Sequence, residues 1–189
     1  MAPQSAAKEH VRGQFEPFMR MRLFAIILGF LVFIVDMASK WWVSSTLALH
    51  YYPVLDGLFT IHYVRNEGIA FGLFHSFESS WKPVVLSLMA IIAVVIVLYY
   101  VWQTPAEERR VFVSLGLLLG GILGNFVDRL FHGYVVDFLE FHWQDSFSWP
   151  TFNIADAAIT IGVILIIFES FFGRQEHAEP ETGKALVDD

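Results

Sequence analysis

The stretch VVLSLMAIIAVVIVLYYVW, residues 84–102, decides the fold class because its 19 residues carry no charged side chain. About 20 apolar residues in a helix are enough to cross the hydrocarbon core of a bilayer. Residues 111–127 form a second stretch, of 17 residues, that also carries no charge. Runs of this length and character are typical of membrane spans, so both stretches predict transmembrane helices.

Two further segments raise the expected number of spans to four. Residues 23–43 are mostly apolar, with one Asp and one Lys inside, and residues 152–168 carry a single acid. A basic lead before a 13-residue apolar run is also typical of a cleaved signal peptide. The small residues of a cleavage site are missing, however, because Asp36 stands where one belongs. We therefore expect the first segment to be a retained helix.

The composition excludes several other classes of protein. Hydrophobic residues make up 56% of the 189-residue chain and charged residues 16%, against roughly 45–50% and about 25% in soluble domains. This profile excludes a disordered chain and argues against an ordinary cytosolic enzyme. The net charge of −7 comes without a basic patch, so we expect no nucleic-acid partner. The absence of Cys excludes disulfides, thiol catalysis and thiolate metal sites.

The positions of the basic residues predict the orientation, because Lys and Arg accumulate on the cytoplasmic side of membrane proteins. Eight of the twelve lie before residue 23, in the short link at residues 103–110, or after residue 172. We therefore expect this link and both termini to be cytoplasmic.

These features predict one membrane-embedded domain, residues 23–172, between a cytoplasmic leader (1–22) and an acidic tail (173–189) that we expect to be disordered. The expected spans are about 23–43, 84–102, 111–128 and 153–172, and the expected extracytoplasmic segments are 44–83 and 129–152.

The two extracytoplasmic segments contain strand patterns. Residues 58–64 are β-branched and aromatic, with polar side chains at alternate positions and turn signals on either side. Residues 134–143 have the same character, and residues 69–74 are suited to return as a hairpin partner. We therefore predict a membrane all-α bundle of four transmembrane helices with a small extracytoplasmic β-sheet.

Polar and ionisable side chains gather at one membrane depth, and such groups are candidates for function because they are costly there. They lie at the outward-facing ends of three spans: Asp36, Lys40, Asn125, Asp128, Arg129, Asn153 and Asp156. Asp36 and Lys40 are four residues apart on one helix face and can form a purely structural pair. A scaffolding role is also favoured for residues 125, 128 and 129, with Asp128 and Arg129 holding different partners.

Asp137 and Asp156 differ from the other acids because neither has a basic residue three or four positions away. Two carboxylates in a low-dielectric site share one proton, since both cannot ionise easily. The charged member can then take a proton from water while the protonated member polarises a carbonyl, as in an aspartic protease. The alternative is that Asp156 caps its helix and Asp137 is a solvated loop acid.

Other catalytic and binding patterns are missing from the sequence. The seven His are scattered without an HExxH motif, and there is no GxSxG elbow and no glycine loop for phosphate. We therefore expect no metal and no cofactor. Gly116, Gly120 and Gly124 form a small-xxx-small pattern, which predicts close helix packing.

Five blocks of sequence resemble the signature blocks of one family. They are Asp36-Met37-Ala38-Ser39-Lys40, Asn66-Glu67-Gly68-Ile69-Ala70-Phe71, Asn125-Phe126-Val127-Asp128-Arg129, Gly133-Tyr134-Val135-Val136-Asp137-Phe138 and Phe152-Asn153-Ile154-Ala155-Asp156-Ala157-Ala158-Ile159. In this order, over about residues 23–170, they are similar to the lipoprotein signal peptidases, the bacterial signal peptidase II family of membrane aspartic endopeptidases. Arg65 and Ile69 depart from the residues that are common at those places.

The resemblance implies an extracytoplasmic β-cradle and cleavage of prolipoproteins just before a lipid-modified cysteine, in the bacterial inner membrane near its outer face. It implies that Asp137 and Asp156 are the catalytic pair and that there is no metal or organic cofactor. The residues implied to bind substrate or support the site are Asp36, Lys40, Asn66, Gly68, Asn125, Asp128, Arg129 and Asn153. The expected partners are lipid-modified prolipoproteins and membrane lipid, and we expect a monomer.

Two other functions remain open from the residues alone. A small transporter is one, although transporters place polar groups near mid-bilayer and show repeat symmetry, whereas here the polar groups lie at one face. A non-catalytic assembly protein is the other, and it would tolerate loss of both aspartates.

Overall fold

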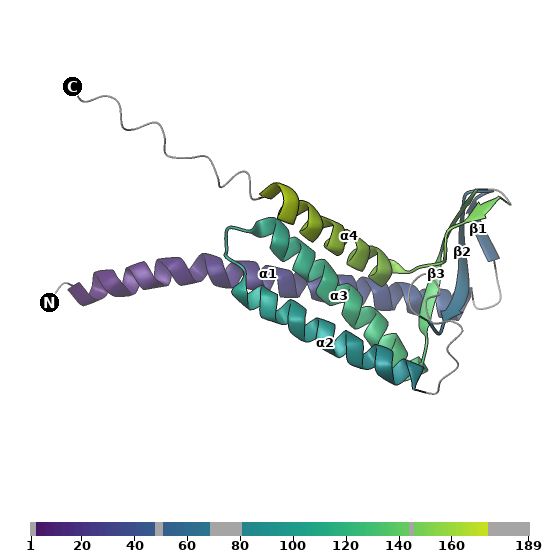
Figure 1. The fold of residues 1–189 in the computed structure, drawn as a ribbon, viewed down its shortest axis with the longest axis horizontal. Helices are drawn as coiled ribbons and strands as arrows, with labels where there is room; N and C mark the ends of the chain where they lie inside the picture. Colours follow the sequence, from purple (N-terminus) through teal and green to yellow (C-terminus); the bar gives the residue numbers. More distant parts are fainter. Residues whose placement is uncertain (1–2, 48–50, 69–80, 144–145, 174–189) are drawn as a thin grey trace, which may run out of the picture.

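The computed structural model describes residues 3–47, 51–68, 81–143 and 146–173, with side chains described from residue 18 onward. The elements in chain order are α1 (Pro3–Thr46), β1 (Tyr51–Leu55), β2 (Phe59–Asn66), α2 (Lys82–Gln103), α3 (Arg109–His132), β3 (Val135–Trp143), β4 (Phe147–Ser148) and α4 (Ile154–Phe168), which continues as a π-helical turn (Glu169–Gly173). The helices lie side by side, and the sheet covers one end of the bundle, away from the start of α1 and the end of α4 (Figure 1).

The predicted fold class is confirmed. Four helical segments are long and apolar enough to cross a membrane: Phe18–Thr46, Lys82–Gln103, Arg109–His132 and Ile154–Phe172. Helix α1 is continuous from Pro3, so most of the predicted leader is helical. The predicted tail, residues 173–189, lies almost wholly outside the described residues.

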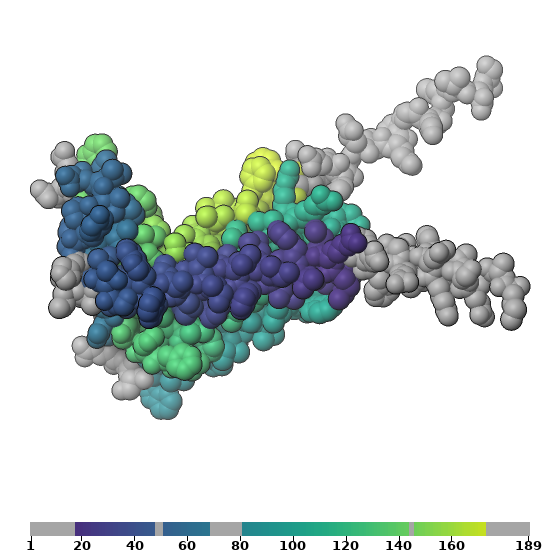
Figure 2. Space-filling model, turned by 180° about the vertical axis from the view of Figure 1, so that it is seen from behind, coloured from purple at the N-terminus to yellow at the C-terminus, as the bar shows by residue number. Residues whose placement is uncertain are grey.

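Helix α3 is the centre of the bundle, packing against α1, α2 and α4. More than half of its apolar window is buried, against less than a fifth in each of the other spans. The remaining helices expose Leu, Ile and Val side chains, as a lipid-facing surface requires. In the space-filling view (Figure 2), α1 runs along the molecule in purple to blue and reaches the sheet at its blue end.

The glycines of α3 permit this close packing, as the small-xxx-small pattern predicts. Gly116 and Gly120 lie against the backbone carbonyls of Ala25 and Gly29 in α1. On another face of α3, Gly121 lies against the carbonyl of Ala155 in α4. The helices on both sides therefore approach the α3 backbone directly, which brings their polar ends close together.

A buried arginine joins α1 to the last turn of α2. The Arg22 side chain is 7% exposed, and its Nε donates to the Val101 carbonyl at 3.3 Å. Its Nη2 donates to the Trp102 carbonyl, and the guanidinium also lies over the Trp102 ring. Arg22 thus pairs with carbonyls that the last turn of α2 leaves without helical partners.

The four strands form one antiparallel series in the order β1-β2-β3-β4. The predicted strands at 58–64 and 134–143 correspond to β2 and β3, whereas β1 and β4 were not predicted from the sequence. Residues 69–74, expected as a hairpin partner, lie outside the described residues.

The pairing of β2 with β3 contains an irregularity between Ile61 and Val64. Beyond it, Val64 pairs with Asp137 and Asn66 with Val135. The sheet is attached to the bundle by apolar contacts, since buried residues of β3 pack against the end of α1: Val136 and Phe138 with Val43 and Leu47. This attachment sets the height of β3 relative to the helix ends.

We predict that Gly120→Ala destabilises the protein. A Cβ at this position would overlap the Gly29 carbonyl oxygen and the Val32 side chain. Overpacking of this kind costs about 1–3 kcal/mol, so the unfolding temperature in detergent should fall. The matched control is Gly29→Ala in the same interface, where the new Cβ meets its nearest neighbour at 3.1 Å and a small shift suffices. Equal stability of the two variants would contradict this account of the packing.

Candidate active site

Nine polar side chains and the backbone of Gly68, from five segments, form one hydrogen-bonded network between the helix ends and the sheet. They are the ten site residues that the sequence analysis named: Asp36, Lys40, Asn66, Gly68, Asn125, Asp128, Arg129, Asp137, Asn153 and Asp156. The structure therefore brings together side chains separated by as many as 120 positions in the sequence.

Asp137 lies in the middle of this network and is only 1% exposed. Its Oδ2 accepts a hydrogen bond from Asn66 Nδ2 at 2.8 Å, and its Oδ1 accepts one from Asn153 Nδ2 at 2.7 Å. The alternative that Asp137 is a solvated loop acid is wrong, because the residue belongs to β3 and is buried.

A tight turn aims Asn66 at Asp137. The Asn66 Oδ1 accepts the backbone N–H of Gly68 at 2.8 Å, as Asn side chains do in turns. With its oxygen engaged in this way, the side chain presents its Nδ2 to the carboxylate. The Gly68 carbonyl in turn accepts a hydrogen bond from Arg129 Nη2 at 3.2 Å.

Asp156 lies in the first turn of α4 and has two partners. Its Oδ1 accepts a hydrogen bond from Asn125 Nδ2 at 2.7 Å, and its Oδ2 accepts the Asn153 backbone N–H at 3.3 Å. The second bond belongs to a capping box, in which Asn153 Oδ1 also accepts the Asp156 N–H. Asp156 therefore does take part in capping its helix, which was the alternative to a catalytic role. The capping box also fixes the direction of the Asp156 carboxylate.

Asn153 connects the two aspartates. Its side chain is fully buried, with Oδ1 engaged in the helix cap and Nδ2 directed at Asp137. Asn153 was expected from the family resemblance to support the site, whereas its role as the N-cap of α4 was not predicted. The signal for a cap is present in the sequence, where an Asn precedes an Asp by three positions at the start of an apolar run.

A buried charge cluster lies behind the aspartates. Lys40 Nζ is 2.7 Å from Asp36 Oδ2 and 3.0 Å from Asp128 Oδ2, so the predicted i,i+4 pair forms and gains a third member. Asp36 Oδ1 accepts the backbone N–H of Ala155, and Asp128 Oδ2, the oxygen that also faces Lys40, accepts that of Val136. The cluster therefore links α1, α3, β3 and α4.

Arg129 has partners different from those of its neighbour Asp128, as expected. It donates to the Gly68 carbonyl from Nη2 and to the Asn125 carbonyl from Nη1 at 3.3 Å. The guanidinium thus ties the turn after β2 to the end of α3.

The surroundings of Asp137 favour its protonated form. Burial and the neighbouring Asp156 carboxylate raise the pKa of Asp137 from its ordinary value of 3.8 to about 7, although hydrogen bonds from Asn66 and Asn153 oppose the rise. At neutral pH this carboxyl can therefore hold or release a proton, which is the property required of a general acid or base.

A cavity of about 830 Å³ opens beside Asp156. Its polar lining includes Asn66, Asn125, Arg129 and Asp156, and its apolar lining comes mainly from α2 and α4, which flank α3. A cavity with a few convergent polar groups in an apolar wall is typical of a binding site. In this cavity, apolar side chains of α2 and α4 are combined with the carboxylate of Asp156.

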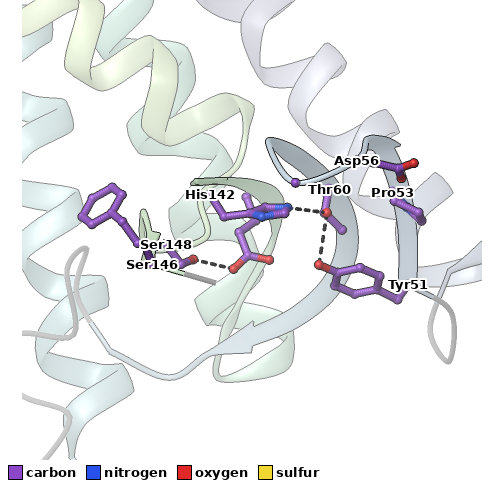
Figure 3. Close-up of a pocket in the computed structure, with 10 residues that line it drawn as sticks. Tyr51, Pro53, Asp56, Thr60, His142, Ser146 and Ser148 are labelled. Carbon is purple, nitrogen blue, oxygen red and sulfur yellow. Dashed lines mark hydrogen bonds between the residues drawn. The ribbon is translucent and has the colours of Figure 1, made fainter. Parts of the chain in front are cut away.

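A second cavity, of about 530 Å³, lies against the sheet and is lined by none of the ten network residues. Figure 3 shows Thr60 between Tyr51 and His142, with hydrogen bonds of 3.1 and 2.9 Å. Ser148 donates to Glu140 at 2.5 Å in the same wall. None of the residues that line this second cavity was a predicted site residue. Across the described part of the chain, no group of three or more His, Asp or Glu side chains is arranged to hold a metal ion.

Comparison with known proteins identifies the family. The family model for signal peptidase II matches residues 28–172. The chain is 36% identical over 158 residues to the lipoprotein signal peptidase of Francisella tularensis subsp. novicida (strain U112), covering 84% of this chain and 98% of that protein. It is 43% identical over 141 residues to the lipoprotein signal peptidase of Shewanella halifaxensis, covering 75% of this chain and 82% of that protein.

Two solved structures of a bacterial membrane enzyme, obtained by the in meso method, have the same fold. The first has a TM-score of 0.72 at 30% identity and covers 84% of this chain and 93% of that one. The second has a TM-score of 0.69 at 30% identity and covers 79% of this chain and 93% of that one. By its sequence, its fold and the order of its polar blocks, this chain belongs to the signal peptidase II family.

Proposed function

We propose that this protein is a bacterial inner-membrane aspartic endopeptidase that removes signal peptides from prolipoproteins by cleaving before the diacylglyceryl-modified cysteine. We assign catalysis to Asp137 and Asp156, acting as a pair. The single observation that carries this assignment is that one residue, Asn153, binds both carboxylates, Asp137 through its side-chain Nδ2 and Asp156 through its backbone N–H, while Asp156 lines an apolar cavity. The names and functions of the relatives supply the substrate class.

The reaction requires the pair to share one proton. The ionised carboxylate takes a proton from water, whose oxygen attacks the carbonyl carbon of the scissile peptide. The protonated carboxyl donates to the carbonyl oxygen as the tetrahedral intermediate forms. The carboxyl that took the proton from water then passes it to the leaving nitrogen, and the other aspartate takes a proton back from the intermediate. The C–N bond breaks, which leaves a carboxylic acid on the signal peptide and an amine on the modified cysteine, and the pair again holds one proton. The raised pKa of Asp137 supports a shared proton at neutral pH.

The cavity beside Asp156 suits an apolar helix. Leu86, Met89 and Ala93 of α2 face Ile161 and Ile164 of α4 across it, and this wall would contact the signal segment. The lipid chains on the cysteine would then remain in the surrounding bilayer. The distribution of Lys and Arg supports an orientation with both termini cytoplasmic, which puts the sheet and the aspartates at the outer face. We propose that the enzyme acts as a monomer.

The other polar residues of the network hold the pair in place. Asn66, Asn125 and Asn153 donate to the two carboxylates, while Arg129 holds the Gly68 turn against α3. The charge cluster of Asp36, Lys40 and Asp128 joins the segments that carry these donors. Preorganised donors of this kind keep the carboxylates oriented without reorganisation during the reaction.

We predict that Asp137→Asn and Asp156→Asn each lower the rate of prolipoprotein processing by at least about 10³-fold, since general acid–base catalysis contributes about 10²–10⁴-fold and neither amide can replace a carboxylate. The measurement is cleavage of a lipidated precursor by purified protein in detergent. The matched control is Glu140→Gln, which removes a half-buried acid outside the network from β3, the strand that carries Asp137. Near-normal turnover by either Asp variant would sink the assignment, whereas normal insertion with no turnover supports it.

We also predict that Asp137 titrates with a midpoint near 7. Because the shift is upward, the carboxyl is protonated below this pH and ionised above it. Infrared difference spectra between the wild type and Asp137→Asn isolate its protonated-carboxyl band, which should disappear as the pH rises through about 7. In the Asp156→Asn background the midpoint should fall, because the neighbouring carboxylate no longer raises the pKa of Asp137, although the effect of burial remains. A wild-type midpoint near the ordinary value of 3.8 would contradict the description of the site.

A further inference from the structure

Building on the proposed catalytic pair, we propose that Lys40 is a positioning residue whose ammonium group fixes the direction of the Asn125 side-chain amide and so keeps an N–H donor on Asp156. The proposal gives the buried lysine a role in the reaction that is distinct from joining helices. It rests on which atoms face each other along the chain from Lys40 through Asn125 to Asp156.

All three N–H groups of the Lys40 ammonium are used. The side chain is 3% exposed, and its Nζ lies 2.7 Å from Asp36 Oδ2, 3.0 Å from Asp128 Oδ2 and 3.0 Å from Asn125 Oδ1. An ammonium has three donors and no acceptor. Whatever part of Asn125 faces Lys40 must therefore be an acceptor, which only the amide oxygen can be.

The direction of the Asn125 amide follows from this contact. Its oxygen also accepts from Asn153 Nδ2 at 3.2 Å, so two donors meet on the same atom. The amide nitrogen then points at Asp156 Oδ1, 2.7 Å away. Rotating the amide by half a turn would place its N–H groups against the ammonium and its oxygen against the carboxylate, and both contacts would be repulsive. Lys40 thus controls a hydrogen bond that it does not itself make.

Joining helices does not require this third contact. Asp36 and Asp128 already supply more than enough negative charge for the ammonium, and the contact with Asp128 already connects α1 with α3. Replacing buried ion pairs by neutral side chains of similar volume is often harmless to stability. The contact between Lys40 and Asn125 connects the charge cluster to the catalytic pair, because Asn125 donates to Asp156. The positive charge of Lys40 also opposes the rise in the pKa of Asp137.

The test is a charge-balanced variant, Lys40→Met with Asp36→Asn. It removes one positive and one negative charge together, so the cluster keeps its net charge while Asn125 loses its ammonium partner. We expect kcat for a lipidated precursor to fall by at least about 10-fold and KM to change less than about 2-fold, because the interaction acts on the reacting group rather than on binding. The matched control is Arg22→Met, which removes a buried cation near the other end of the apolar span of α1, Phe18–Thr46. It should lower the unfolding temperature and leave kcat unchanged.

A double-mutant cycle separates positioning from structural support. If Lys40 acts through Asn125, the charge-balanced pair of substitutions should lower kcat by less than about 2-fold in an Asn125→Ala background, since coupled residues are not additive. The proposal would be overturned if the charge-balanced substitutions lowered kcat by the same factor with Asn125 present and with Asn125→Ala. It would also be overturned if they left kcat unchanged in the otherwise wild-type protein.

A single substitution gives a second test if the charge-balanced variant does not fold. Asn125→Asp keeps an oxygen toward Lys40 but has no N–H for Asp156, so kcat should again fall by at least about 10-fold. Full activity would overturn the proposal. If Asp137→Asn and Asp156→Asn are inactive while Asn125→Asp is fully active, only the role of Lys40 is rejected. If the two Asp variants are themselves active, the catalytic pair is rejected.

Discussion

A charged group at the depth of a membrane is tolerated only with a partner, and this constraint shapes the end of the bundle beneath the sheet. Lys40 requires acceptors from another helix, and Asp36 and Asp128 in turn require backbone N–H groups from α4 and β3. Each pairing therefore fixes one more element relative to α1. The glycine contacts along α3 make the pairing possible, because they bring the backbones close enough for short side chains to reach.

The two aspartates are held by different kinds of structure. Asp137 lies on a strand and depends on the pairing of β2 with β3, whereas Asp156 lies in the first turn of a helix and depends on its cap. Asn153 couples the two because it caps the helix with one atom of its side chain and binds the strand residue with another. A shift of the sheet relative to α4 would break one of these contacts. The relative position of the two aspartates therefore depends on the position of the sheet against α4.

Much of this arrangement could be predicted from the sequence, because long apolar runs and alternating strands are local patterns. The four spans, β2, β3 and all ten network residues follow from such patterns or from family blocks. The short strand β4 and the exposed strand β1 could not be predicted, since β4 has two residues and β1 has no buried face. The partners of Asn125 and Asn153 were also beyond prediction. They depend on contacts between distant segments, whereas the amides themselves carry no local signal of which way they point.

The register of β2 against β3 beyond the irregularity between Ile61 and Val64 limits where insertions and deletions can occur in these strands. Successive strand residues point to opposite faces, so gaining or losing one residue between this irregularity and Asn66 would turn Asn66 away from Asp137. Insertions and deletions are therefore expected to be rejected in the second half of β2 and in β3 as far as Asp137. In the connection between β3 and β4 they leave that pairing unchanged. Across related proteins, length variation should be confined to the segments outside this frame, even where the individual residues inside it differ.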